Sequence, residues 1–146
     1  MHVARTFTVS RPITEVFDYL SDFEHTIEWD PGTVETRRTA GDGGLGTTYS
    51  NRSQFMGRET ELTYETIGFT RPTFFSCRGN NKSATATDSM TFSKSGEGTQ
   101  INYRADFEFR GIARFLAPLI VPRKLESLAD ETVEQITHTL ERGTTS

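Results

Sequence analysis

The feature that most restricts the fold of this chain is a change of hydrophobic period at Gly111. Residues 33–110 alternate apolar and polar side chains, as half-buried strands do. Turn-forming stretches interrupt this alternation at AGDGGLG, MGR, TRP, GNNK and KSGEG. After Gly111 the apolar residues follow the helical period of about 3.6 residues. The sequence therefore predicts six antiparallel strands followed by a long helix.

The last strand and the helix show their apolar faces most clearly. The inward face of the strand is predicted to carry Ile101, Tyr103, Ala105, Phe107 and Phe109. The helix carries one apolar stripe, formed by Leu125, Leu128, Ala129, Val133, Ile136 and Leu140. Because Pro118 and Pro122 precede this stripe, we expect residues 112–122 to form a separate or kinked short helical piece.

The first 32 residues predict one strand and two short helices. Residues 2–9 alternate like a strand. A helix over about 12–20 follows, with Ser10 as its expected cap and Pro12 in its first turn. A second short helix is predicted to begin at Ser21 or Asp22 and to end at Pro31-Gly32. Its apolar residues are Phe23, Ile27 and Trp29.

Length and composition exclude several classes of protein. The 146 residues fit one domain, 1–146. The net charge of -4 and the lack of a basic block argue against nucleic acid as a partner. No secretion signal or membrane-spanning apolar run is visible, so we expect a cytoplasmic protein. The single cysteine, Cys77, excludes an internal disulfide, and its apolar neighbours indicate a buried, inert thiol.

These elements give an α+β protein whose apolar faces must cover one another. In a two-layer solution the curved sheet wraps around the terminal helix. A strongly bent sheet does not lie flush on a straight helix along its whole length. We therefore expect a space lined by large side chains between the two layers.

The order of elements resembles that of the SRPBCC superfamily. The resemblance rests on FDYLSDFEHTIEWDPG, on FMGRETELTYE and on GIARFLAPLI after the aromatic last strand, and it runs from about Val3 to Leu140. This superfamily includes the START lipid-transfer domains, the birch-pollen-allergen-like proteins and the polyketide cyclase/dehydrase branch. The resemblance implies a helix-grip fold, with a seven-stranded curved antiparallel sheet around the C-terminal helix and two short helices after strand 1. It also implies a cavity for an apolar or amphipathic small molecule. The two short helices would close the open end of the sheet and form part of the rim of this cavity. It specifies the fold better than the activity.

Strand parity and the helix stripe give a set of cavity candidates. The predicted cavity residues are Trp29, Tyr49, Asn51, Phe55, Leu62, Tyr64, Asp88, Met90, Tyr103, Phe107, Leu125, Leu128 and Ala129.

Asp88 and Tyr103 are the candidates for catalysis. A carboxyl group between Ala86 and Met90 on an inward face would have a raised pKa and could act as an acid, a base or a ligand anchor. The favoured alternative is a β-bulge near Thr87 to Ser89 that turns Asp88 to solvent, because unpaired buried carboxylates are costly.

The hydroxyl groups of Tyr49, Tyr64 and Tyr103, with the Asn51 amide, could orient the polar end of a ligand. Each tyrosine taken singly is expected to fill core volume instead.

Other polar residues indicate no further site. His2, His25 and His138 fit no metal-ligand spacing, so no metal and no cofactor is predicted, and His25 could lie at the entrance of the cavity. The glycines of GDGGLG precede a strand, which indicates a hairpin turn and not a phosphate-binding loop. Arg58, Glu59 and Glu61 are assigned to the solvated face of the sheet.

Three functions remain open at this point. The favoured one is binding or carriage of a small hydrophobic ligand: a lipid, an isoprenoid or an aromatic polyketide. The first alternative is a polyketide cyclase or dehydratase that uses the same cavity, which requires Asp88 or a tyrosine pair to converge within hydrogen-bond reach. The second alternative is a protein-regulating module that docks through the terminal helix and residues 115–121.

Overall fold

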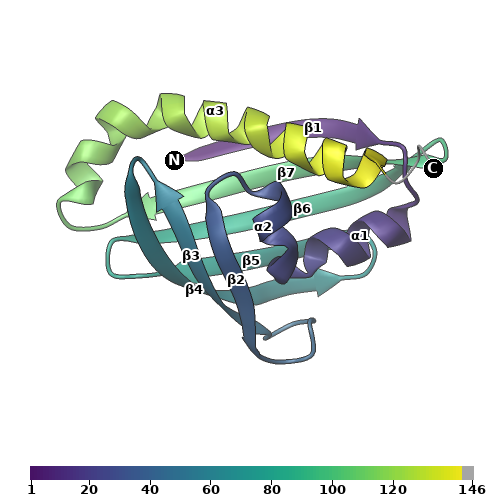
Figure 1. Cartoon of the computed structure of the whole chain (residues 1–146), viewed down its shortest axis with the longest axis horizontal. Helices are drawn as coiled ribbons and strands as arrows, with labels where there is room; N and C mark the ends of the chain where they lie inside the picture. The colour runs from purple at the N-terminus through teal and green to yellow at the C-terminus, as the bar shows by residue number, and fades with distance from the viewer. Residues whose placement is uncertain (143–146) are drawn as a thin grey trace.

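Seven strands form one antiparallel sheet in the computed structural model, which describes residues 1–142 apart from the side chain of Ile120 (Figure 1). The strand order is β1-β7-β6-β5-β4-β3-β2, so neighbours in sequence are neighbours in space except where β1 pairs with β7. The strands are β1 (His2–Val9), β2 (Thr33–Ala40), β3 (Thr48–Phe55), β4 (Arg58–Thr70), β5 (Phe74–Asn80), β6 (Ala84–Ser95) and β7 (Gly98–Phe109). The predicted first strand and the six strands of residues 33–110 are confirmed.

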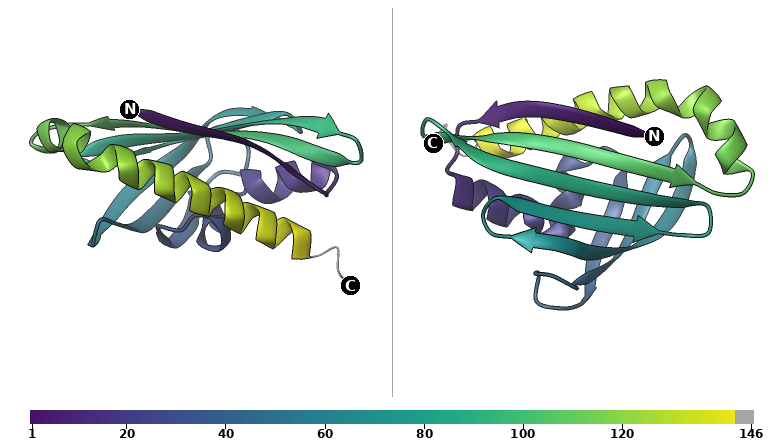
Figure 2. Two further views of the ribbon diagram at one scale, coloured as in Figure 1. Left: turned by 90° about the horizontal axis from the view of Figure 1, so that it is seen from above. Right: turned by 180° about the vertical axis from the view of Figure 1, so that it is seen from behind.

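The helices lie on one face of this sheet (Figure 2). They are α1 (Ile13–Ser21), the 3-10 turn η1 (Phe23–His25), α2 (Thr26–Trp29) and α3 (Ala113–Glu141). This arrangement confirms the predicted helix-grip fold.

Two local expectations about the first helices are wrong. Ser10 does not cap α1, which begins after Pro12 with no side-chain cap, and the Ser10 N–H donates to the Glu141 carboxylate at the far end of α3. Ile27 is 56% exposed, because the buried face of this segment carries Phe23, Thr26 and Trp29 at a spacing of three residues. Asp22 does cap the second segment, since its carboxylate accepts a hydrogen bond of 3.1 Å from the Glu24 N–H.

The two prolines do not separate a helical piece from α3. Residues 113–141 form one helix with Pro118 and Pro122 inside it. Its axis changes direction near its start (Figure 2), which is how a helix accommodates the missing N–H groups and the ring of proline. The prediction of a kink holds and that of a separate piece is wrong.

Irregular pairing bends the sheet. The register shifts between Thr33 and Glu35 and between Arg38 and Ala40 in the β2–β3 pair, and between Thr66 and Gly68 in the β4–β5 pair. Bulges of this kind bend a strand and increase its twist. Strands β2 and β3 therefore run at a steep angle to β6 and β7, and β4 bends from the direction of β3 into that of β5 (Figure 1). The sheet thus curves around α3.

Ion pairs join helix α3 to the edge strand β1, and the apolar stripe of the helix packs into the core. Arg5 on β1 donates to Glu126 at 2.5 Å and to Asp130 at 2.9 Å. The buried stripe positions are Leu125, Ala129, Ile136 and Leu140.

One end of the interior is filled by aromatic rings. Phe17 of α1 makes edge contacts with Phe69, Phe75 and Phe92, at ring-centroid distances of 5.2, 6.2 and 5.5 Å. Phe75 and Phe92 stack at 6.0 Å. We call this cluster of Phe17, Phe69, Phe75 and Phe92 the aromatic end.

Candidate functional site

A cavity of about 520 Å³ lies between the concave face of the sheet and α3. Strands β1, β3, β4, β6 and β7, helix α3 and the turn after α2 all contribute to its wall. This volume is within the range of sites that hold small molecules, roughly 300–1,000 Å³.

Small side chains explain why this part of the interior is hollow. Ala84 and Ala86 of β6 and Ala105 of β7 face the cavity from the sheet, and Ala117 and Ala129 face it from α3. A methyl group on each side leaves a gap that larger residues would close. The cavity therefore depends on residue size as well as on the curvature predicted from the sequence.

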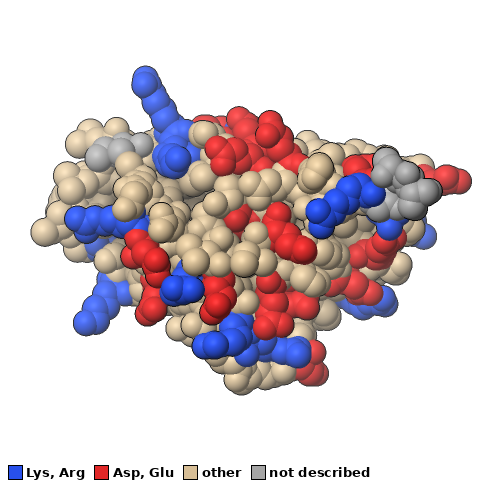
Figure 3. Space-filling view, in the orientation of Figure 1, with Lys and Arg blue, Asp and Glu red and all other residues tan. Residues whose placement is uncertain are grey.

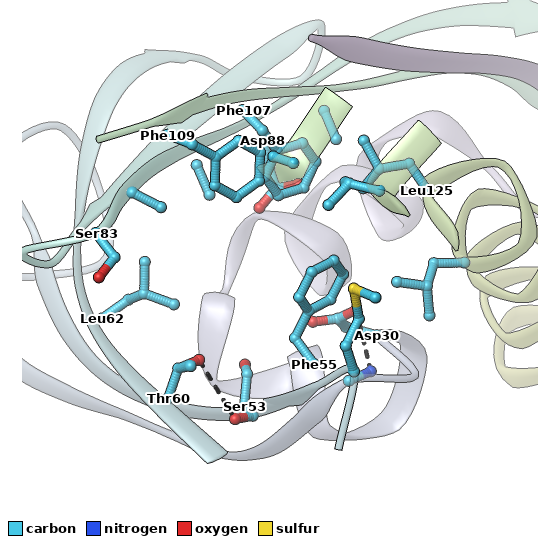
Figure 4. A pocket seen from close by; sticks show the side chains of 18 of the residues that line it. Asp30, Ser53, Phe55, Thr60, Leu62, Ser83, Asp88, Phe107, Phe109 and Leu125 are labelled. Carbon is cyan, nitrogen blue, oxygen red and sulfur yellow. Dashed lines mark hydrogen bonds between the residues drawn. The ribbon is translucent and has the colours of Figure 1, made fainter. Parts of the chain in front are cut away.

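The structure brings most of the predicted cavity residues together around this space. Those that line it are Phe55, Leu62, Tyr64, Asp88, Tyr103, Phe107, Leu125, Leu128 and Ala129. Figure 4 shows several of them projecting into the cavity from different elements.

Four predicted residues lie elsewhere in the core. Trp29 and Tyr49 pack against Phe23, with ring centroids 6.2 and 5.8 Å apart. Asn51 is buried in a polar contact, where its amide donates to Thr36 Oγ1 at 2.8 Å. Met90 is fully buried at the end of β6 that meets the aromatic end. All four are buried as predicted, Tyr49, Asn51 and Met90 by strand parity and Trp29 by its place on the apolar face of α2, but neighbouring side chains fill the space in front of them.

Asp88 faces the cavity, and the favoured expectation of a bulge is wrong. Strand β6 pairs without a register shift on both sides, with Asp88 opposite Cys77 on β5 and Ala105 on β7. The Tyr103 hydroxyl donates a hydrogen bond of 3.0 Å to Asp88 Oδ1. Burial, reinforced by the charge of Asp30, raises the pKa of Asp88 to about 7.

Asp30 is a second carboxyl group in the cavity wall, and it is not among the residues predicted from the sequence. It lies in the Trp29-Asp30-Pro31-Gly32 turn after α2, where it accepts hydrogen bonds from Thr33 Oγ1 at 2.6 Å and from the Gly32 N–H at 3.5 Å. Burial raises its pKa. Its signal in the sequence was a charged residue beside a core tryptophan. Figure 4 shows Asp30 and Asp88 on different walls of the cavity.

Tyr64 and Tyr103 complete the polar lining near these acids. Burial and the neighbouring Asp88 charge raise the pKa of both phenols well above the usual value, so both stay protonated. The Tyr64 ring lies directly over Gly79 of β5, where a Cβ would sit only 2.6 Å from the ring. Glycine at this position allows the ring to lie flat against the sheet.

Arg58 lies at the β3–β4 hairpin, and its assignment to the solvated face of the sheet is incomplete. Its side chain is exposed, yet it lines the cavity beside Met56. Met56 and Gly57 form the hairpin turn with φ angles of 53° and 81°, a combination typical of a tight two-residue turn. This turn brings Arg58 to the rim of the cavity.

The start of α3 forms another part of the rim. Leu116, Ala117 and Val121 line the cavity, while Phe115 and Leu119 are 70% and 81% exposed. Docking of this segment on another protein stays a prediction.

The histidines and Cys77 lie outside the cavity wall. His25 stacks on Tyr19 at 4.4 Å, and the Tyr19 carbonyl lies 2.7 Å from its Nδ1, so the expectation of His25 at the entrance is wrong. His2 and His138 are exposed. Cys77 is fully buried, as predicted, and burial raises its pKa to about 12. Within residues 1–142 no group of three or more histidine, cysteine or acidic side chains is arranged to hold a metal ion.

On the face drawn in Figure 3, basic and acidic side chains are interspersed and form no continuous basic area. This face therefore lacks the basic patch that binding of a polyanion requires. None of the helices in the described part of the chain has the length and apolar character needed to cross a membrane.

Comparison with known proteins confirms the family resemblance. A family model described as polyketide cyclase/dehydrase and lipid transport matches residues 1–141. No curated protein matches the sequence.

Several solved structures share the fold. TTHA0849 from Thermus thermophilus is 14% identical, with a TM-score of 0.82 over 100% of both chains. The di-domain aromatase/cyclase StfQ from the steffimycin biosynthetic pathway is 11% identical, with a TM-score of 0.74 over 99% of this chain and 52% of that one. Ara h 8.0201 is 14% identical, with a TM-score of 0.67 over 96% of this chain and 94% of that one. At these identities the likeness shows the fold alone.

Proposed function

The chain belongs to the polyketide cyclase/dehydrase and lipid transport family, and we propose that it binds and carries a small hydrophobic ligand in the cavity between the sheet and α3. Candidate ligands are a lipid, an isoprenoid or an aromatic polyketide. The observation that carries this proposal is the cavity of about 520 Å³ under the sheet. The aromatic end of the same sheet is solidly packed by contrast.

The lining supports a largely apolar guest. Apolar side chains make up most of the wall, from Leu62 on β4 to Leu125 on α3, and alanine, leucine and phenylalanine are the commonest of them. An apolar molecule that leaves water for such a wall gains about 25 cal/mol per Å² of surface buried. The wall exists before the ligand arrives, so little ordering opposes binding.

Direct binding tests this function. We expect calorimetric titration with dodecanol to show one saturable site, and native mass spectrometry of gently purified protein to show a retained small molecule. A protein that neither retains a small molecule nor binds dodecanol saturably would contradict the proposal.

A second candidate, a cyclase or dehydratase, is favoured by the contact between Tyr103 and Asp88. The hypothesis required Asp88 or a tyrosine pair to converge within hydrogen-bond reach, and Asp88 Oδ1 lies 3.0 Å from the Tyr103 hydroxyl on the cavity wall. A carboxyl group with a pKa of about 7 can take a proton from a bound substrate and return it. Once Asp88 has taken this proton, the single O–H of Tyr103 is released from the carboxylate and can donate to a carbonyl oxygen on which negative charge develops.

Separate measurements of affinity and turnover distinguish the two candidates. If the protein is an enzyme, Asp88→Asn should lower turnover of candidate polyketides at least about a hundredfold, the typical contribution of a general acid or base. Affinity for the same compounds should change far less. Turnover that is unchanged in both Asp88→Asn and Tyr103→Phe would remove these residues from any mechanism.

A further inference from the structure

Two carboxyl groups face the apolar cavity, and neither has a cationic partner among the described residues. Asp88 accepts a hydrogen bond from Tyr103, and Asp30 accepts from Thr33 and Gly32. The only cationic side chain in the described wall is Arg58, which is exposed at the rim. The charge inside the cavity is therefore uncompensated whenever these acids ionise.

Both acids keep capacity for further hydrogen bonds. An ionised carboxylate has about four acceptor positions on its two oxygens. Asp88 uses one of them, on Oδ1, and Asp30 uses two. Water in the cavity can occupy the remainder, but a ligand that fills the cavity must replace that water or leave the acceptors unsatisfied.

Tyr64 gives an independent indication of a polar ligand group. Its side chain is only 7% exposed and lines the cavity, and its hydroxyl makes no hydrogen bond to any residue in the described part of the chain. Buried tyrosine hydroxyls normally find a partner. Because the ring lies over Gly79, the hydroxyl is held in place and requires its partner from within the cavity.

We propose that the ligand of this cavity is an amphipathic amine, whose apolar body fills the alanine-lined space and whose protonated nitrogen donates hydrogen bonds to Asp88, with Asp30 and the Tyr64 hydroxyl facing the same space. This inference rests on the proposed function, because it names the chemical class of the ligand carried there. An ammonium group supplies three donors and a positive charge, which suits a wall of acceptors without a counter-charge.

The two other simple head groups fit less well. A hydroxyl group donates one hydrogen bond and brings no charge, so it satisfies fewer acceptors. A carboxylate brings a third negative charge into the space between Asp30 and Asp88, where repulsion is strong because the surroundings are apolar. The expected order of affinity is amine, then alcohol, then carboxylate.

Ligands of one chain length test this order. Dodecylamine, dodecanol and dodecanoate would be titrated by calorimetry at neutral pH, below the concentrations at which they aggregate. We expect dodecylamine to bind roughly tenfold to a hundredfold more tightly than dodecanol, the range that hydrogen bonds to charged groups supply. Dodecanoate should bind most weakly.

Variants locate the effect. Asp88→Asn keeps the size of the side chain and should remove most of the preference for dodecylamine while leaving dodecanol binding within about threefold. Asp30→Asn should reduce the preference by a smaller factor. The matched control is Asp106→Asn on β7, an acid that pairs with Arg104 at 2.8 Å outside the cavity wall, and it should leave all three affinities unchanged.

The outcomes separate this inference from the function on which it rests. If dodecanol binds but dodecylamine binds no more tightly, the amine inference is wrong and the carrier function stands. If dodecanoate binds most tightly, Arg58 at the rim selects the ligand and the inference is likewise wrong. If none of the three binds, the carrier function itself fails.

Discussion

The two ends of the space under the sheet are built from the same strands and differ in side-chain size. On β6, Met90 and Phe92 are fully packed, the latter within the aromatic end, whereas Ala84 and Ala86 on the same strand face the cavity. On β7, Ile101 is fully buried and Ala105 lines the cavity. Backbone curvature allows a hollow, and the small side chains of Ala84 and Ala86 on β6 and of Ala105 on β7 help to decide where it lies.

The two ends also differ in how many polar side chains face the interior. At the aromatic end the inward side chains are almost all apolar, as tight packing favours. We call the end of the interior that contains the cavity the hollow end. Its wall includes the acids Asp30 and Asp88 and the phenols Tyr64 and Tyr103, and burying these groups would be costly in a dry, filled core. Polar groups of this kind are retained where they meet a ligand or water.

The largest expected difference between the ends is in stability. Phe17→Ala should lower the free energy of unfolding by about 3–5 kcal/mol, because three aromatic neighbours lose their contacts and a new cavity remains. Phe107→Ala at the hollow end should cost only about 1 kcal/mol, because that ring already borders open space. Chemical denaturation measures both, and equal losses would show that the two ends are packed alike.

A second test closes the hollow end. Ala86→Phe should lower the affinity for dodecanol at least roughly a hundredfold, because the ring occupies the ligand's space, while stability changes by no more than about 1 kcal/mol. The control is Ala4→Phe, which adds the same ring to an exposed position on β1. A severe loss of stability in Ala86→Phe would indicate that the end is already filled.

The third test uses the acid in the cavity wall. The pKa of Asp88 is about 7 in the folded protein and near 3.8 in the unfolded chain. The folded protein therefore binds the proton more tightly, and Asp88 lowers stability progressively as the pH rises from about 4 to about 7. Asp88→Asn lacks this loss, so above pH 7 it should be more stable than the wild type by about 1–3 kcal/mol.

Denaturation midpoints measured across this pH range provide the check. The stability difference between Asp88→Asn and the wild type should grow with pH and level off above the folded-state pKa. Parallel stability profiles would mean that Asp88 is solvated like a surface acid.

The smallest effect is expected at Tyr103. Tyr103→Phe removes the hydrogen bond to Asp88 and should cost about 0.5–1.5 kcal/mol. The same change should move the pKa of Asp88 further upward, because that hydrogen bond lowers it. An NMR titration of the Asp88 carboxyl carbon measures the shift, and a lower pKa in the variant would contradict the assigned contact.

The sequence predicted the elements well and the cavity wall in part. Hydrophobic period identifies strands and helices because each has a fixed geometry. Parity correctly turned Tyr49, Asn51 and Met90 inward, but it carries no information on which neighbours fill the space beyond them. That information lies in three-dimensional packing between distant segments.

Asp30 illustrates a second limit. A turn residue has no parity, so nothing in the local pattern indicates that its carboxylate faces the same cavity as Asp88 on β6. The bulge favoured for Asp88 failed for a different reason. Burying a carboxylate in a dry core is costly, which favoured the bulge, whereas Asp88 faces a cavity and has Tyr103 as a partner.

The most direct measurement of the central claim is a methyl-resolved NMR titration with dodecanol that compares the two ends in one molecule. We predict saturable shifts for the methyl groups of Ala86, Ala105 and Leu125, and no shifts for Val9 and Val16, which are buried away from the cavity wall. Shifts that never saturate, or that are equally large at Val9 and Val16, would contradict a preformed ligand cavity at the hollow end.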